Sequence, residues 1–529
     1  MGKYLNPGNG GFSEILKTDY VDKTGMIGLI NSTIGTKTKL TCISRPRRFG
    51  KSYATQMLCA YYDGECDSSS LFEGRKISTD PHYKEYLNKY NVLYLDITGF
   101  ISNLKRKKLP LNEVVSIITD EIKKELVEAM PELSELKEVT DCIRTYADRT
   151  GKQFVFILDE WDAIIREGKK DNSTQEAYLN LLREWFKNGN FTPYVVAAAY
   201  MTGILPIKKD GTESAISDFM EYTVLNPAIF AEYTGFTNEE VKELCEGLGG
   251  QYSTMKEWYD GYSFTKESSV YNPYSVMMAL RMGNYESFWQ KTSAAESLST
   301  YIDMNYEGLQ DDILRLIAGE QLEVNVNGYE NDMESFKNKD DVLTLLIHLG
   351  YLAYDLREKT VRIPNKEVCE EFKELLRNGG KTKLCDLVRL SDKLLEDTLA
   401  GNESEVCRRI EAVRESSYAP TFYNDEQALR YVVKFAYISC VDRYLRIEEL
   451  PSGKGIADVV FLPKKKTALP AMVVELKWDK TKEAAIKQIL DRNYPEAIRD
   501  YIGEVVLVGI SYDEKKKSHS CRIERMDKT

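Results

Sequence analysis

A lysine and a hydroxyl follow a glycine at Gly50-Lys51-Ser52, the residue types that hold a nucleotide's phosphates. An apolar run at 40–43 precedes them and helical spacing follows, so we expect a strand, a loop and a helix. Backbone N–H groups at the helix start would face the phosphates, with Lys51 on the β and γ oxygens and Ser52 on Mg²⁺. Arg45 stands where the first glycine of G-x-x-x-x-G-K-[ST] belongs, and a basic surface loop is the alternative. The flanking strand and helix favour a phosphate-binding loop of Arg45, Pro46, Arg47, Arg48, Phe49, Gly50, Lys51 and Ser52.

A second apolar run, at 154–158, ends in a cluster of acids that begins with Asp159 and Glu160. Such runs are typical of strands buried on both faces of a parallel sheet, whose carboxyl edge binds ligands. Asp159 would hold Mg²⁺ through water, and Glu160 would orient or deprotonate an attacking water. The alternative is a strand that ends in solvated acids. A further apolar run at 194–201 ends at Thr202, which either senses the γ-phosphate or simply ends the strand.

Length and composition describe an ordinary globular protein. The 529 residues are enough for about three or four domains, and strands that alternate with helices predict an α/β fold with a parallel, doubly wound sheet. No apolar stretch could span a bilayer, so no membrane partner is expected. The ten cysteines are scattered singly, which fits a reducing cytoplasm. The net charge of −12 argues against non-specific coating of nucleic acid.

The first 290 residues resemble bacterial AAA-ATPase-like proteins. The motifs that carry the resemblance are Tyr20 to Thr24, Arg45 to Ser52, Leu158 to Asp162, Thr202 to Ile204, Tyr233 to Glu240, Trp258 to Tyr262 and Tyr271 to Ser275. Because the arginine-bearing loop is the usual form in that family, Arg45 does not indicate an inactive site. The resemblance implies a P-loop fold of the AAA/STAND type with a helical lid, and ATP as the nucleotide. It also allows a homo-oligomer, since such ATPases often take an arginine from a neighbouring subunit.

The region that follows shows a helix pattern at 342–352 and two strand-like runs at 353–356 and 361–363. A helix followed by a hairpin resembles a winged-helix module. Basic residues on the hairpin make DNA contact one interpretation, and a module that packs between the two ends of the chain is the other. His348 lies in an apolar helix and is expected in the core. Residues 370–415 read as charged, amphipathic connecting helices.

The last part of the chain places three chemically active residues on two apolar strands. Asp458 lies in the run 455–461, while Glu475 and Lys477 lie two residues apart in the run 471–477 and so share one face. A hairpin that brings Asp458 beside Glu475 would create an oxygen-rich site for Mg²⁺ or Mn²⁺. Lys477 could then orient or deprotonate water for attack on a phosphodiester.

This constellation resembles the PD-(D/E)XK nuclease superfamily over residues 418–511. Glu426 matches the acid on that family's first helix, and Gln488 and Tyr494 match the helix after the lysine strand. The resemblance implies catalytic roles for Glu426, Asp458, Glu475, Lys477 and Gln488.

Together these patterns predict a cytoplasmic, bacterial-type ATPase fused to a metal-dependent nuclease that cuts DNA under nucleotide control. The alternative is a nucleotide-dependent switch or scaffold whose nuclease-like domain binds nucleic acid without cutting it, and RNA or a modified nucleic acid is a third substrate class. The expected domains are an AAA-like ATPase at 1–235, a helical lid at 236–290, a winged-helix-like region at 291–370, a helical connector at 371–415 and a restriction-endonuclease-like α/β domain at 416–529.

Overall fold

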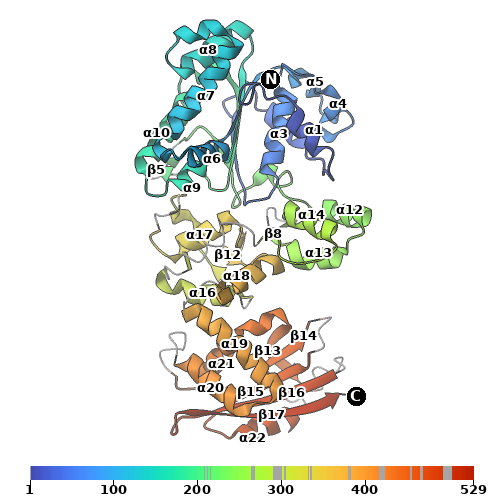
Figure 1. Ribbon diagram of the computed structural model, residues 1–529. Helices are drawn as coiled ribbons and strands as arrows, with labels where there is room; N and C mark the ends of the chain where they lie inside the picture. The colour runs from blue at the N-terminus through green and yellow to red at the C-terminus, as the bar shows by residue number, and fades with distance from the viewer. Residues whose placement is uncertain are drawn as a thin grey trace. The chain divides into compact units, whose positions relative to one another are not determined.

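The computed structural model divides the chain into two compact units (Figure 1). The first contains Met1–Lys291 and Glu323–Val368, and the second contains Thr292–Leu322 and Cys369–Thr529. The structure describes residues 2–207, 209–210, 213–214, 216–263, 269–289, 301–302, 306–317, 319–331, 333, 336–378, 383–415, 423–452, 455–464, 469–491 and 503–528. None of the helices in these ranges combines the length and apolar character that a membrane span requires.

A parallel five-stranded sheet forms the centre of the first unit. Its order is β2-β3-β4-β1-β7, so β4 separates the strand before the P-loop from the strand that carries the acids. The central strands β3 and β4 are buried throughout and read as runs of mostly apolar residues because both faces are covered. The bounds are β1 Leu40–Ser44, β2 Asn91–Asp96, β3 Phe154–Asp159, β4 Val196–Gly203 and β7 Met220–Tyr222.

Helices cover both faces of this sheet, and side chains that alternate along the strands build a separate core on each (Figure 1). Cys42 and Phe156 face one core, while Ile43 and Val155 face the other. The first core includes α6 Ile97–Lys107, α7 Val114–Ala129, α8 Val139–Thr150, α9 Ala163–Glu167 and α10 Asn172–Phe186. The second includes α1 Gly10–Ile15, α2 Gly25–Asn31, α3 Lys51–Tyr62, α4 Ser69–Phe72 and α5 Tyr83–Tyr86.

One predicted strand starts later than expected. The sequence pattern placed a strand over 194–201, but a short helix, α11 Thr192–Val195, precedes β4. Pro193 occupies the first turn of this helix, where its fixed φ and missing N–H are tolerated. Thr202 lies within β4, one residue before the end of the strand.

The lid is a small helical group with its own apolar core. Its helices have strong start signals: a capping box between Thr237 and Glu240 opens the first, and the Asn272 side chain accepts from the N–H groups of Tyr274 and Ser275 at the start of the third. The elements are α12 Asn238–Leu248, α13 Tyr252–Tyr259, β8 Tyr262–Ser263, β9 Ser269–Val270 and α14 Pro273–Met282.

The helix and hairpin expected after the lid are present. They are α17 Lys339–Leu349, β11 Ala353–Asp355 and β12 Thr360–Arg362, and the two strands pair antiparallel. His348 is buried in α17, as predicted. Arg362 donates to the carbonyl oxygens of Gly261, at 2.8 Å, and Pro364, at 3.2 Å. This wing arginine therefore contributes to packing against the lid.

The second unit contains the connecting helices and a five-stranded mixed sheet, ordered β13-β14-β15-β16-β17. Only β15 and β16 pair parallel. The strands are β13 Tyr444–Ser452, β14 Gly455–Pro463, β15 Ala471–Trp478, β16 Gly503–Asp513 and β17 Ser518–Lys528. The helices are α16 Leu309–Ile317, α19 Lys383–Ala400, α20 Glu403–Arg414, α21 Glu426–Ala436 and α22 Lys482–Asp491, while α18 Lys366–Asn378 begins in the first unit.

Candidate functional sites

The loop between β1 and α3 is shaped as a phosphate-binding loop needs to be. Gly50 caps α3 in the left-handed conformation, with φ +82°, a region open to glycine at little cost. The Lys51 ammonium lies back across the loop and donates to the carbonyl oxygens of Arg45, at 3.1 Å, and Pro46, at 3.0 Å. The lysine is thus held at the helix N-terminus, where an anion would be stabilised.

The two acids predicted at the end of β3, Asp159 and Glu160, lie beside this loop. Lys51 Nζ lies 3.3 Å from Glu160 Oε1, and Asp159 accepts a 2.6 Å hydrogen bond from Thr202. Burial raises the pKa of Asp159, and hydrogen bonds from Thr202 and Ser52 offset only part of that effect. Thr202 is fully buried, so it supports the Asp159 carboxylate from within the protein. The structure brings Lys51, Ser52, Asp159, Glu160 and Thr202 together.

Glu160 occupies an unusual position at the end of the strand. Its φ is +53°, a conformation rare outside glycine and common at functional sites. Burial raises its pKa, but the charges of Lys51 and Arg166 outweigh burial and leave the pKa lowered. Arg166 Nη2 lies 2.5 Å from Glu160 Oε2, and its Nε lies 2.9 Å from Asp162. The Asp162 carboxylate also accepts from the backbone N–H of Leu205 at 2.9 Å, so it is a structural anchor.

Arg45 has a structural position beneath the loop. It is fully buried, and it donates to the Thr234 hydroxyl and to the carbonyl oxygens of Ser44 and Tyr222, each at 2.8 Å. Burial lowers the pKa of Arg45 to about 9, which still leaves the guanidinium charged at neutral pH. Arg47 is half-buried; burial lowers its pKa, and the charges of Arg166 and Glu160 act on it from the acidic cluster.

The rest of the P-loop contacts the lid and the hairpin region. Arg48 donates to the carbonyl oxygen of Phe288 at 2.6 Å, and its guanidinium stacks 4.0 Å over the Tyr274 ring. Phe49 is buried against the Tyr262 ring, with centroids 5.2 Å apart. A Cβ placed on Gly350, the residue after α17, would lie only 2.7 Å from Cβ of Pro46. Pro46, Arg48 and Phe49 therefore fix the loop to its surroundings.

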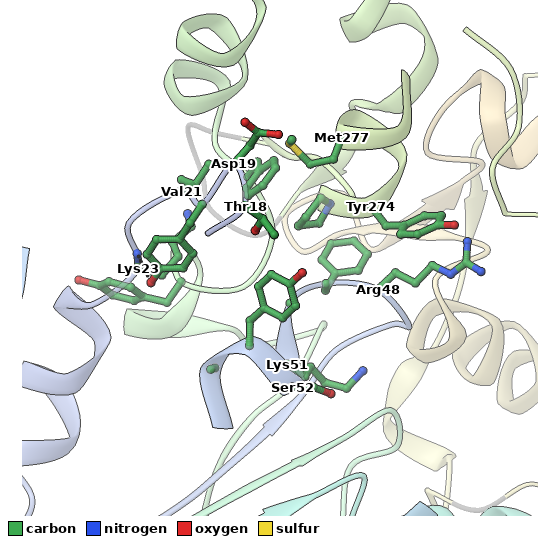
Figure 2. Close-up of a pocket in the computed structure, with 18 of the residues that line it drawn as sticks. Thr18, Asp19, Val21, Lys23, Arg48, Lys51, Ser52, Tyr274 and Met277 are labelled. Atoms are coloured by element: carbon green, nitrogen blue, oxygen red, sulfur yellow. Dashed lines mark hydrogen bonds between the residues drawn. The ribbon is translucent and has the colours of Figure 1, made fainter. Parts of the chain in front are cut away.

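A pocket of about 390 Å³ opens above the P-loop. Lys51 and Ser52 lie at one end, and Asp19, Val21 and Met277 at the other (Figure 2). The polar groups of Lys51 and Ser52 suit a nucleotide's phosphates, and the apolar and aromatic side chains elsewhere in the lining suit its base. Its apolar and aromatic lining includes Val21, Tyr20, Met57, Tyr233, Phe236, Tyr274, Met277 and Met278.

Tyr20 contributes both to the pocket and to the core of the first unit. It lines the pocket and also packs against the core on the α3 side of the sheet. Among the pocket residues on α14, Tyr274 belongs to a motif that the sequence analysis singled out, whereas Met277 and Met278 had no sequence signal of their own.

The second site is a buried cluster of four predicted residues. The β14–β15 pairing ends at Val459 opposite Val474, and Asp458, the preceding residue of β14, accepts from Leu476 N at 2.9 Å through Oδ2. Lys477 donates to Glu475 Oε1 at 2.8 Å, and Gln488 of α22 donates to the same oxygen. Asp458, Glu475 and Lys477 are 6%, 1% and 6% exposed. Such buried charges persist only when paired.

Two features of this site were not predicted. Arg430, on α21, forms an ion pair with Asp458 Oδ1. Glu426 lies four residues earlier on the same helix and has no hydrogen-bond or ion-pair partner among the described residues. Among the described residues, no group of three or more acids, histidines or cysteines is poised to hold a metal, so the catalytic role of Glu426 stays a prediction. Tyr494 lies outside the described residues.

The donor chemistry of this pair suits a divalent cation. Two carboxylates from adjacent strands supply hard oxygen ligands, which Mg²⁺ and Mn²⁺ prefer. The amide of Gln488 and the ammonium of Lys477 fix one of these carboxylates, as supporting hydrogen bonds do around bound metals.

Comparison with protein families gives one match in each half of the chain. Residues 8–213 match a family described as Predicted AAA-ATPase. Residues 410–521 match the PD-(D/E)XK nuclease superfamily. Both predicted resemblances are therefore supported, and with them the predicted fold class, a P-loop parallel sheet followed by a restriction-endonuclease-like α/β domain. No curated protein matches the chain significantly.

Two solved structures show a distant likeness to this chain. The Walker-type ATPase PABY2304 of Pyrococcus abyssi is 14% identical, with 67% of this chain and 96% of that chain covered and a TM-score of 0.31. The ORC2 protein of Aeropyrum pernix, in its ADPNP-ADP complexes, is 12% identical, with 69% and 96% covered and a TM-score of 0.30. Scores this low carry no argument about the function of this chain.

Proposed function

We propose that this protein is an ATPase fused to a metal-dependent nuclease, and that nucleotide binding controls cleavage of DNA phosphodiester bonds. The observation that carries the proposal is the convergence of Asp458, Glu475, Lys477 and Gln488 in a domain that matches a nuclease superfamily. The ATPase part of the proposal rests on the P-loop and on the acids at the end of β3, which lie beside each other on the same chain.

In the first unit, ATP would occupy the pocket above α3. The backbone N–H groups at the start of α3 and the Lys51 ammonium would bind the phosphates, and the apolar wall would hold the base. Ser52 and Asp159 would hold Mg²⁺, which neutralises phosphate charge when bound. Glu160, ionised beside Lys51 and Arg166, would orient the attacking water. Incoming phosphates would compete with Glu160 for Lys51.

In the second unit, Asp458 and Glu475 would hold Mg²⁺ or Mn²⁺, which supplies a Lewis acid at the scissile phosphate when bound. Lys477 donates to Glu475, so its ammonium lies at the edge of the carboxylate pair, where it orients water or the phosphate. Gln488 holds Glu475 in position from α22.

The experiment is cleavage of linear and circular DNA by the full-length protein with Mg²⁺ or Mn²⁺. The substitution Asp458→Ala is expected to reduce the cleavage rate by about a hundredfold or more, because transition-state charge stabilisation worth several kcal/mol is lost. Asp491→Ala, which removes an exposed aspartate of the same domain, should cut at the wild-type rate.

Two outcomes would count against the nuclease. If the wild type binds DNA but never cuts it, the protein is a nucleotide-dependent switch or scaffold. If Asp458→Ala cuts as fast as the wild type, the cleavage belongs to another site or to a contaminant.

The proposal also covers the boundaries of the domains and the cellular location of the protein. We assign the ATPase to 1–235, the lid to 236–290, the winged-helix-like region to 291–370, the connector to 371–415 and the nuclease to 416–529. We also propose a bacterial cytoplasm, in keeping with the free thiols of the described cysteines. A homo-oligomer would supply the arginine that such ATPases take from a neighbour.

A further inference from the structure

The nuclease carboxylates are bound by an arginine that lies outside the recognised motif. Arg430 extends from α21 to Asp458 Oδ1, while the other oxygen of Asp458 accepts from the backbone N–H of Leu476. The side chains of Arg430 and Asp458 are 20% and 8% exposed, so this pair is largely shielded from water. Both oxygens of a predicted metal ligand are therefore engaged by the protein itself.

Each carboxylate of the cluster has a basic partner. Asp458 is paired with Arg430, and Glu475 is paired with Lys477. A divalent cation seeks the same carboxylate oxygens and would also bring two positive charges next to the Arg430 guanidinium and the Lys477 ammonium. A guanidinium keeps its proton at neutral pH, so Arg430 can release Asp458 only by moving.

An alternative partner lies on the same helix. Glu426 precedes Arg430 by four residues, and an acid placed four residues before a base is the favourable order for an ion pair on a helix. Glu426 is half-buried and has no partner among the described residues, so its carboxylate is available.

We propose that Arg430 competes with the divalent cation for Asp458 and transfers to Glu426 when the cation binds. This inference rests on the proposed nuclease function and assigns Arg430 as a positioning residue. It also gives Glu426 a role as the acceptor of the displaced arginine. The ion pair keeps the carboxylates compensated until a cation replaces the guanidinium.

The test is the dissociation constant of Mn²⁺, measured on the full-length protein without DNA or nucleotide by the electron paramagnetic resonance signal of free Mn²⁺. Arg430→Met should tighten binding by about tenfold or more, the factor that corresponds to one charged hydrogen bond. Lys434→Met is the matched control, because it removes a cation from the same helix that pairs with Glu320 instead. Its dissociation constant should equal that of the wild type.

A double-mutant cycle separates the acceptor role of Glu426 from direct metal ligation. Glu426→Gln should weaken Mn²⁺ binding in the wild-type background and have no effect in the Arg430→Met background. If Glu426→Gln weakens binding equally in both backgrounds, Glu426 is a ligand and the transfer is disproved. If Arg430→Met binds Mn²⁺ no tighter than the wild type, there is no competition.

Two further measurements keep the test decisive. If Arg430→Met does not fold, Arg430→Lys replaces it; tighter binding than in the wild type is expected, and an unchanged constant overturns the inference. A wild type that binds no Mn²⁺ also overturns it. Mn²⁺ binding that follows the expected pattern without any DNA cleavage would support this inference while refuting the proposed function.

Discussion

Neighbouring acids at the end of β3 have opposite pKa shifts, although they are consecutive in sequence. Burial dominates at Asp159 and raises its pKa, whereas Lys51 and Arg166 outweigh burial at Glu160 and lower its pKa. Environments that separate two carboxylates in this way allow them to take different roles. Glu160 remains ionised beside the P-loop lysine and is suited to orient water.

This difference predicts how stability responds to acid. A carboxylate whose pKa is lowered by folding stabilises the native state above its unfolded pKa of about 4.3, and the stabilisation is lost as the pH falls through the folded value. Glu160→Gln should remove that part of the pH dependence. The melting temperature between about pH 6 and about pH 3.5 should therefore fall less in Glu160→Gln than in the wild type.

The control is Glu128→Gln, which changes an exposed glutamate on α7. Its melting temperature should follow the wild-type pH profile. Identical profiles for Glu160→Gln and the wild type would show that the ion pairs of Glu160 contribute nothing to folding.

At the scale of elements, the P-loop is held between the lid and the residue that ends α17. The Tyr262 ring packs on Phe49, and its hydroxyl donates to the Gly350 carbonyl oxygen at 2.8 Å. Pro46 lies close to Gly350 on the other side of the loop. A displacement of the loop by nucleotide therefore has to be accommodated by these neighbours, since packed interiors transmit strain.

Gly350→Ala tests this arrangement. Gly350 has φ +88°, and an added Cβ would lie 2.7 Å from Pro46, so alanine strains the backbone and also displaces the P-loop. We expect a loss of about 1–2 kcal/mol of stability and a weakening of ATP binding by about tenfold or more, because the loop N–H groups lose their alignment with the phosphates.

Gly249→Ala is the matched control. Gly249 ends α12 with φ +78° and has no atom within 4 Å of an added Cβ, so alanine there adds backbone strain alone. Its stability should fall by a similar amount while its ATP affinity stays at the wild-type value. Equal ATP affinities for the two variants would refute the contact between α17 and the P-loop as a determinant of nucleotide binding.

Most individual elements were predictable because buried strands and amphipathic helices leave periodic patterns. The strands around 40–44, 154–159 and 471–478 appear where apolar runs predicted them. The predicted start of β4 was wrong because an apolar run cannot by itself distinguish a strand from a short helix.

Contacts between elements were not predictable from local sequence. The pairing of Arg430 with Asp458 joins residues 28 apart, and Arg166 of α9 donates to Glu160, whose backbone has the positive φ of +53°. Arg166 follows Asp162 by four residues, a spacing that favours an ion pair on a helix. The sequence could therefore have indicated the pair of Arg166 with Asp162, but not its pair with Glu160.

At the scale of the whole molecule, a domain that matches an AAA-ATPase family and a domain that matches a nuclease superfamily share one chain. The chain passes from the second unit to the first within Leu322–Glu323, and back to the second at Val368–Cys369, inside α18. The Glu367 carboxylate, just before that second passage, accepts from Ser275 and from the backbone of Phe288, whose carbonyl oxygen in turn accepts from Arg48 of the P-loop. Hydrogen bonds thus connect the P-loop to the start of α18.

The most direct test of nucleotide control is the ratio of DNA cleavage rates with and without ATP, at a fixed Mg²⁺ concentration, for the wild type and Lys51→Ala. Asp458→Ala serves as the control that is expected to have lost DNA cleavage. We predict that the ratio differs from one in the wild type and equals one in Lys51→Ala, which should still cut DNA because its nuclease residues are intact. A wild-type ratio of one at saturating ATP, or an ATP effect that persists in Lys51→Ala, would contradict the account.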